Sequence, residues 1–154
     1  MEHTLAPEFP ASLDWLNTTE PVRMAQLRGK VCALAFINAG SAWSTQRLND
    51  LAHLHARHGE RLNVVAIHVP KFEHERDARR AGRRLRRQKF EFPLAHDADW
   101  VAWQQFGIEA WPTVVLIDGD GRIRDRVVGE GPIRELDMRV SQLIAGLVPR
   151  SRST

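Results

Sequence analysis

Residues 31–44 read VCALAFINAGSAWS and join two kinds of pattern. The first seven letters form a short, unbroken apolar run, which is typical of a strand buried on both faces of a sheet. From residue 42 onward, leucines recur at helical spacing up to Gly59, which favours a helix over residues 42–58. A buried strand that leads directly into a long helix predicts the beginning of an α/β fold.

Strand-like and helical patterns continue to alternate along the rest of the chain. Two Asp-Gly pairs near residue 120 separate two apolar runs and predict a β-hairpin. The other predicted elements are a strand at 62–69, helices at 73–88, 97–106 and 132–145, and the hairpin strands at 114–117 and 123–128. Strands joined by helices pair in parallel through right-handed crossovers, whereas the hairpin adds antiparallel strands. The sequence therefore predicts a mixed central sheet with helices on both faces.

Length and composition fit one domain. A chain of 154 residues, 43% hydrophobic and 27% charged, can bury a sizeable core without disulfides. We expect residues 1–13 to form an arm on the domain and residues 148–154 to form a frayed tail. The apolar runs are too short to cross a bilayer, and the N-terminus does not resemble a secretory signal. We therefore expect a cytoplasmic protein without a membrane partner.

Several short segments, in order, resemble one known family. Trp111-Pro112-Thr113 stands just before a strand that enters a hairpin, which resembles the cis-proline loop of thioredoxin-like proteins. The segments with this resemblance are APEFP at 6–10, LDWLNT at 13–18, LRGK at 27–30, IHVPKF at 67–72 and WPTVVLID at 111–118. Together they are similar to the thioredoxin-like domain of NHL-repeat-containing proteins, of the TlpA-like or redoxin type. The resemblance implies a thioredoxin fold with an N-terminal extension and an extra helix.

The chain departs from that family at its redox pair. The family carries a C-x-x-C pair at the start of the helix after the first buried strand, and the aligned positions here hold Ser41 and Ser44. Disulfide exchange needs a thiolate, and a serine hydroxyl can neither ionise comparably nor form a disulfide. We expect Ser41 or Asn38 to cap the helix instead. The neighbours Ala39-Gly40 also differ from the family, which favours natural loss of the pair over engineering.

The remaining candidate ligands and nucleophiles predict no metal site, no cofactor and no intact catalytic residue. Cys32 lies inside the first apolar run, where a free cysteine is expected to be a buried core residue. His55 and His58 are spaced to share a metal, but neither cysteine nor carboxylate accompanies them at ligand spacing. We therefore expect His53, His55 and His58 to be solvated. We expect His68, at a strand end, to satisfy a local hydrogen bond.

Trp43 stands between the two serines and is the candidate binding residue. The resemblance implies that Trp43 lies near Trp111, Pro112 and Thr113, along a loop that receives extended substrate segments. An exposed aromatic pair there could bind a protein or peptide after redox chemistry is lost. Packing of Trp43 against Pro112 is an equally weighted alternative.

The third candidate is a basic helix. Residues 71–89 hold nine Lys or Arg against three Asp or Glu, although the whole chain has a formal net charge of only +3. The arginines of this helix are Arg76, Arg79, Arg80, Arg83, Arg84, Arg86 and Arg87. They could meet phosphates or an acidic protein, but no base-stacking aromatics are interleaved, so we expect a solvated surface rather than a nucleic-acid partner.

These observations predict a redox-inactive, thioredoxin-like module that binds an unknown protein or peptide. Two alternatives stay open at this point. One is a thiol–disulfide oxidoreductase relative whose cysteines were lost or mutated. The other is a polyanion- or nucleic-acid-binding protein that uses the arginine helix at residues 76–87.

Overall fold

The sheet has the strand order β1-β4-β3-β2-β5-β6 in a computed structural model that describes residues 3–147. The strands are β1 (Asp14–Trp15), β2 (Val31–Ile37), β3 (Leu62–His68), β4 (Leu94–His96), β5 (Thr113–Ile117) and β6 (Ile123–Val128). The central strands β2, β3 and β4 are parallel, whereas β1, β5 and β6 pair antiparallel to their neighbours. This mixed sheet confirms the predicted fold class.

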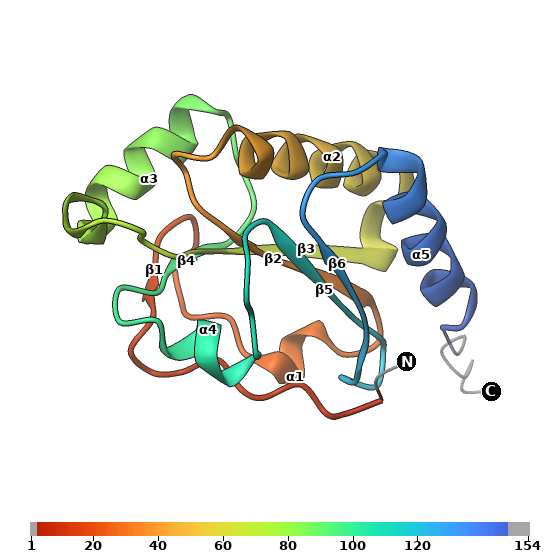
Figure 1. The fold of residues 1–154 in the computed structure, drawn as a ribbon. Helices are drawn as coiled ribbons and strands as arrows, with labels where there is room; N and C mark the ends of the chain where they lie inside the picture. Colours follow the sequence, from red (N-terminus) through yellow and green to blue (C-terminus); the bar gives the residue numbers. More distant parts are fainter. Residues whose placement is uncertain (1–2, 148–154) are drawn as a thin grey trace.

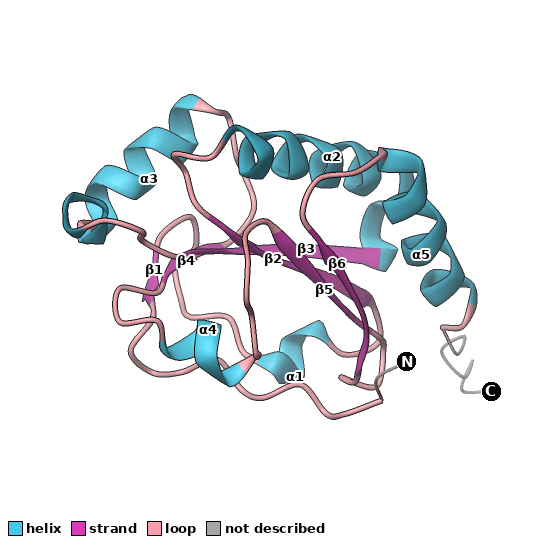
Figure 2. Ribbon diagram, in the orientation of Figure 1, coloured by secondary structure: helices cyan, strands magenta, loops and turns pink. Residues whose placement is uncertain are grey.

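Helices cover both faces of the sheet (Figures 1 and 2). One face carries α2 (Ala42–His58), α3 (Ala78–Arg87) and α5 (Ile133–Ala145), and the other carries α1 (Met24–Leu27) and α4 (Val101–Gln105). Short 3₁₀ turns, η1 (Gly59–Arg61) and η2 (Glu73–Arg76), precede β3 and α3. Every residue of β2 is buried, and alternate side chains enter the two core clusters on opposite faces.

Two predicted helices are shorter than the sequence indicated. The helix predicted over residues 73–88 is divided at Asp77, whose backbone is extended and whose carboxylate accepts from the amide of Arg79 at 2.9 Å. The helix predicted over residues 97–106 begins only at Val101, because Trp100 before it has a left-handed φ of 64°. In both cases a local backbone conformation makes the α-helix begin later than the hydrophobic spacing predicts.

The sequence patterns missed β1, α1 and β4. These elements have two, four and three residues, too few for a hydrophobic period to emerge. The strand β4 nevertheless extends the parallel sheet beside β3, and β1 closes that edge. In the N-terminal segment, Leu5 bridges to Arg122, while Phe9 and Leu13 are buried. The predicted tail at 148–154 lies outside the described residues.

Within residues 3–147, none of the helices has the length and apolar character that crossing a lipid bilayer requires.

Candidate binding site at the start of α2

Two serines begin α2, and both of their hydroxyls serve the backbone. Ser41 is the N-cap residue, and its Oγ accepts from the amide of Ser44 at 3.3 Å. Ser44 is fully buried, and its Oγ accepts from the amide of Asn38 at 3.1 Å. Capping by Ser41 confirms the role expected for this residue. In the part of the chain that the structure describes, neither hydroxyl has an imidazole or carboxylate within hydrogen-bond distance, so neither has a base to activate it.

Trp43 lies on the surface between these serines. Trp43 is 57% exposed, so more than half of this residue faces solvent. An open groove of about 270 Å³ runs beside Trp43 toward Glu130 and Gly131, in the loop between β6 and α5. Val128, at the end of β6, is also 61% exposed. Trp43 itself therefore offers apolar area next to a groove.

The cis-proline loop is joined to this surface through the sheet. Thr113 pairs with Phe36 of β2, which places Pro112 beside the end of the strand that leads to Ser41. The Trp111–Pro112 peptide bond is cis, as the family resemblance implies. The carbonyl of Pro112 accepts from the amide of Gly129 at 2.7 Å. The start of α2, the loop at 111–113 and the end of β6 are thus neighbours in the fold.

Arg47 fastens the β6–α5 loop to α2. Its guanidinium is almost completely buried, pairs with Asp50 at 3.2 Å and donates to the carbonyl oxygens of Gly129 at 3.3 Å and Gly131 at 3.5 Å. The charge of Arg47 is therefore balanced inside the protein, and its donors fix one wall of the groove beside Trp43.

Trp111 belongs to a cluster of three tryptophans. Its ring centroid lies 5.9 Å from that of Trp100 and 5.3 Å from that of Trp103, and the latter two are 4.9 Å apart. Trp103 is buried, whereas Trp111 and Trp100 are half-buried. The hydroxyl of Thr113 donates to the carbonyl of Ala110 at 2.6 Å. Packing from α4 therefore holds Trp111 in place while part of its ring stays open.

A buried histidine pair lies at the ends of β3 and β4. The Nδ1 atoms of His68 and His96 are 3.0 Å apart, and Nε2 of His96 lies 2.9 Å from the carbonyl oxygen of Arg76. Because that oxygen can only accept, Nε2 of His96 carries its proton, and its Nδ1 accepts from Nδ1–H of His68. Burial, and next the proximity of His96, lowers the pKa of His68 to about 4. His68 is therefore neutral at pH 7.

His68 makes a hydrogen bond, as predicted, but its partner lies on the neighbouring strand, 28 residues along the chain. Its partner His96 was missed because it lies in β4, which left no pattern in the sequence.

Glu75 ties η2 to the turn that precedes Ser41. Its Oε1 accepts from the amides of Lys71 at 2.7 Å and Phe72 at 2.9 Å, and from Nδ2 of Asn38 at 3.2 Å. Partial burial acts to raise the pKa of Glu75, but these hydrogen bonds outweigh it and lower the pKa. The other oxygen, Oε2, would lie only 3.3 Å from a Cβ added to Gly40. The turn therefore has room for glycine and little more.

A small pocket of about 60 Å³ opens beside this turn. Its lining joins the turn, the end of β3, η2 and α3, and it includes Ala39, His68, Glu75, Arg80 and Arg84. Two of the seven predicted arginines are thereby brought to the turn at residues 38–41, which we call the serine turn. The others lie elsewhere on the surface, and Arg76 forms an ion pair with Asp99 at 2.7 Å.

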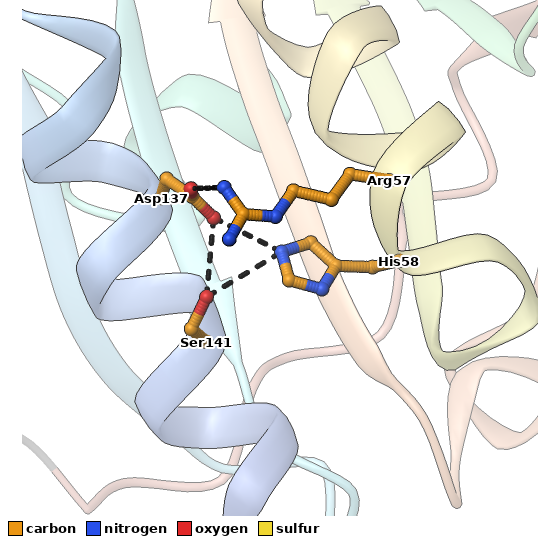
Figure 3. A network of polar contacts seen from close by, with 4 residues as sticks. All are labelled: Arg57, His58, Asp137 and Ser141. Atoms are coloured by element: carbon orange, nitrogen blue, oxygen red, sulfur yellow. Dashed lines mark hydrogen bonds and ion pairs between the residues drawn. The ribbon is translucent and has the colours of Figure 1, made fainter.

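The expectation that all the α2 histidines are solvated is wrong for His58. Its side chain is only 9% exposed, and Nε2 lies 3.0 Å from Oδ1 of Asp137 and 3.5 Å from Oγ of Ser141 (Figure 3). The carboxylate and hydroxyl share one ring nitrogen, whereas a catalytic triad uses opposite nitrogens. The network joins α2 to α5, and Arg57 completes it through an ion pair with Asp137.

The described part of the chain holds neither a cluster of metal ligands nor an exposed cysteine. Residues 3–147 contain no group of three or more His, Cys, Asp or Glu side chains arranged to hold a metal ion. Cys32 is fully buried, as predicted, and burial raises its pKa to about 12. It is the second residue of β2, about 16 Å of strand before Ile37, so it is remote from the serine turn.

Comparison with known proteins identifies relatives along most of the chain. The profile of the AhpC/TSA family matches residues 3–126. Protein SUPPRESSOR OF QUENCHING 1, chloroplastic, from Arabidopsis thaliana is 33% identical over 135 residues, which cover 87% of this chain and 13% of that protein. NHL repeat-containing protein 2 from Bos taurus is 31% identical over 140 residues, which cover 89% and 19%. This chain therefore spans less than a fifth of either relative.

A solved structure confirms the fold. The thioredoxin-like superfamily protein SPOA0173 superposes with a TM-score of 0.85 at 21% identity, and the match covers 95% of this chain and 99% of that one. The predicted resemblance to thioredoxin-like domains, including those of NHL-repeat-containing proteins, is confirmed.

Proposed function

The chain belongs to the AhpC/TSA family, and from that premise we propose that it is a redox-inactive, thioredoxin-like module that binds an extended segment of a protein partner. The observation that carries the proposal is the start of α2, where Trp43 is exposed between Ser41 and Ser44, the two serines that the family resemblance aligns with the redox pair.

The loss of redox chemistry is supported by where every candidate nucleophile lies. Both serine hydroxyls serve the backbone, and no base accompanies them in residues 3–147. The one thiol, Cys32, is buried and protonated at neutral pH, whereas disulfide exchange needs an accessible thiolate.

The binding role is supported by the surface that surrounds the serines. Trp43 is more than half exposed, and the groove beside it has a wall fixed by Arg47. Exposed tryptophan combines large apolar area with few rotatable bonds, which suits it to anchor a partner. A rigid wall also lowers the entropy lost on binding.

A disulfide-reduction assay tests the loss of redox chemistry. The unchanged protein should reduce insulin disulfides no faster than the assay's thiol reductant alone. The Ser41→Cys, Ser44→Cys variant should gain a thiol-dependent rate, because the N-terminus of α2 stabilises a thiolate. The single variant Ser44→Cys is the matched control. A thiol-dependent rate from the unchanged protein would overturn this part of the proposal.

A selection from a random dodecapeptide phage library tests the binding role. Peptides selected on the immobilised protein should lose about 30-fold in affinity against Trp43→Ala, which is typical of a tryptophan hot spot. The matched control is Met138→Ala, because Met138 is 58% exposed on α5, away from the groove. If no peptide is enriched, or if Met138→Ala weakens binding as much as Trp43→Ala, the proposed function is wrong.

A further inference from the structure

The helix α3 borders the proposed binding surface on the side opposite Glu130. A Cβ added to Gly40, one residue before Ser41, would lie 3.8 Å from Nη1 of Arg84. Arg80 and Arg84 also line the small pocket beside Ala39. A segment bound across Trp43 and Trp111 that continues past the serine turn would therefore meet these guanidinium groups.

Six arginines of α3 lie on the surface without a counterion from the described part of the chain. Arg79, Arg80, Arg83, Arg84, Arg86 and Arg87 are all exposed. Within residues 3–147, none of these six pairs with a carboxylate, whereas Arg76 pairs with Asp99. The Glu75 carboxylate shares this pocket with Arg80 and Arg84, and its single negative charge offsets only part of the positive charge of the six arginines. This end of the surface therefore carries positive charge that residues 3–147 do not balance.

The two sides of α3 face different parts of the molecule. Arg80 and Arg84 point toward the serine turn, as their pocket with Ala39 shows. Arg79 lines a separate groove together with Trp15, and an added Cβ on Gly82 would lie between Leu16 and Arg86. Arg79 and Arg86 thus face the N-terminal segment, and the helix offers a matched pair of arginines on each side.

Charge changes sign across the surface. Glu130 is exposed beside Trp43 in the groove on the far side, and it forms no ion pair with any described residue. The guanidinium of Arg47 in the same groove is neutralised by Asp50. A bound segment therefore meets a carboxylate at one end and arginines at the other, all of them unpaired within residues 3–147.

We propose that the partner segment is acidic where it passes α3, and that Arg80 and Arg84 bind its carboxylates. This inference rests on the proposed function and names the class of segment that the site accepts. The planar guanidinium matches a carboxylate with two parallel hydrogen bonds, which gives such contacts both strength and direction. A protein segment is favoured over a nucleic acid because the arginines adjoin the apolar surface at Trp43, and because the aromatic rings beside α3, Phe72 and His74, already stack on each other at 5.7 Å.

The phage selection provides the probes for the test. The peptides that depend on Trp43 should be enriched in Asp and Glu on one side of their apolar residue. Labelled copies of these peptides should lose about tenfold in affinity against Arg80→Gln, Arg84→Gln, and less than about twofold against Arg79→Gln, Arg86→Gln. All four positions are exposed, so equal thermal midpoints should confirm that both variants fold.

The outcomes separate this inference from the proposed function. Peptides that bind through Trp43 without an excess of acids, and without sensitivity to Arg80→Gln, Arg84→Gln, would overturn the inference and leave the proposed function standing. Equal loss in both arginine pairs, with competition by duplex DNA and a steep salt slope, would assign α3 to nucleic acid and also overturn it. Failure to enrich any Trp43-dependent peptide would remove the proposed function itself.

Discussion

Arg47 shows how one buried charge can organise a surface. It donates to two carbonyl oxygens of the β6–α5 loop, and it pairs with Asp50, which lies three residues further along α2. Its Nε atom is buried without a hydrogen-bond partner among residues 3–147, so the arrangement is not optimised for stability alone. The residue instead fixes the position of a loop next to Trp43.

Arg47→Ala should therefore cost about 3 to 5 kcal/mol of unfolding free energy, because it leaves the Asp50 carboxylate buried without its cation. The double variant Arg47→Met, Asp50→Leu should recover most of that loss, since both charges are removed together. Urea unfolding followed by tryptophan fluorescence measures both. If the double variant is as unstable as the single one, the loop contacts and not the ion pair carry the stability.

His68 should make the protein acid-sensitive in a defined range. Its pKa is about 4 in the folded protein, against an ordinary histidine value of 6.5, so the unfolded chain binds more protons between those two values. Stability should fall by about 3 kcal/mol as the pH drops from 6.5 to about 4. His68→Asn should flatten this slope, and the exposed control His53→Asn should retain it. An unchanged slope in His68→Asn would contradict the assignment.

At the scale of single residues, the sequence was informative where neighbours in the chain decide a role. Ser41 caps a helix that begins one residue later, and Cys32 lies within an apolar run, so local patterns were sufficient for both. The roles of Arg47 and His96 depend on partners 82 and 28 residues away. No spacing rule within one sequence indicates such pairings.

The helices α2 and α5 are joined by the polar network of Figure 3. Partial burial acts to raise the pKa of Asp137, but hydrogen bonds from His58 and Ser141 and the charge of Arg57 outweigh it and lower the pKa. A carboxyl group with a lowered pKa stabilises the fold above its unfolded value, and that contribution is lost as the pH falls through the folded value. The contact is therefore strongest at neutral pH.

Asp137→Asn should lower the unfolding free energy at pH 7 by about 2 kcal/mol, because the hydrogen bonds it weakens are charge-assisted. The difference from the unchanged protein should shrink as the pH falls below about 4, and it should vanish only below the lowered pKa of folded Asp137, where both side chains are neutral. The matched control Asp99→Asn removes the exposed pair with Arg76 and should cost less than about 1 kcal/mol. Chemical unfolding over a pH series measures this. A constant difference in unfolding free energy between Asp137→Asn and the unchanged protein would contradict the prediction.

Long periodic elements were predictable, and short or interrupted ones were not. The bounds of α2 agree with the prediction because leucines and a glycine stop mark the helix along its whole length. The predicted helix over 73–88 failed at Asp77, since a side chain that accepts from the backbone two residues later breaks a helix without altering its charge pattern. The strand β4 depends on pairing with β3 rather than on its own three residues.

For the whole molecule, the alternation of strands and helices was sufficient to predict the layers. The order of elements determined a mixed sheet with helices on both faces, and the structure confirms it. What alternation could not indicate is how loops from separate elements meet. The proposed binding surface is assembled from the start of α2, the loop before β5, the end of β6 and one side of α3.

Because Cys32 is fully buried in the central strand, the reactivity of its thiol can report on unfolding. A maleimide or another alkylating reagent can reach the sulfur only when the central strand leaves the sheet, and that strand is held by neighbours on both edges. Labelling kinetics would then count global openings directly, in native buffer, with no added denaturant. The chain thus carries its own thiol reporter of global unfolding, and the variants discussed above that introduce no cysteine keep this thiol as the one that reacts.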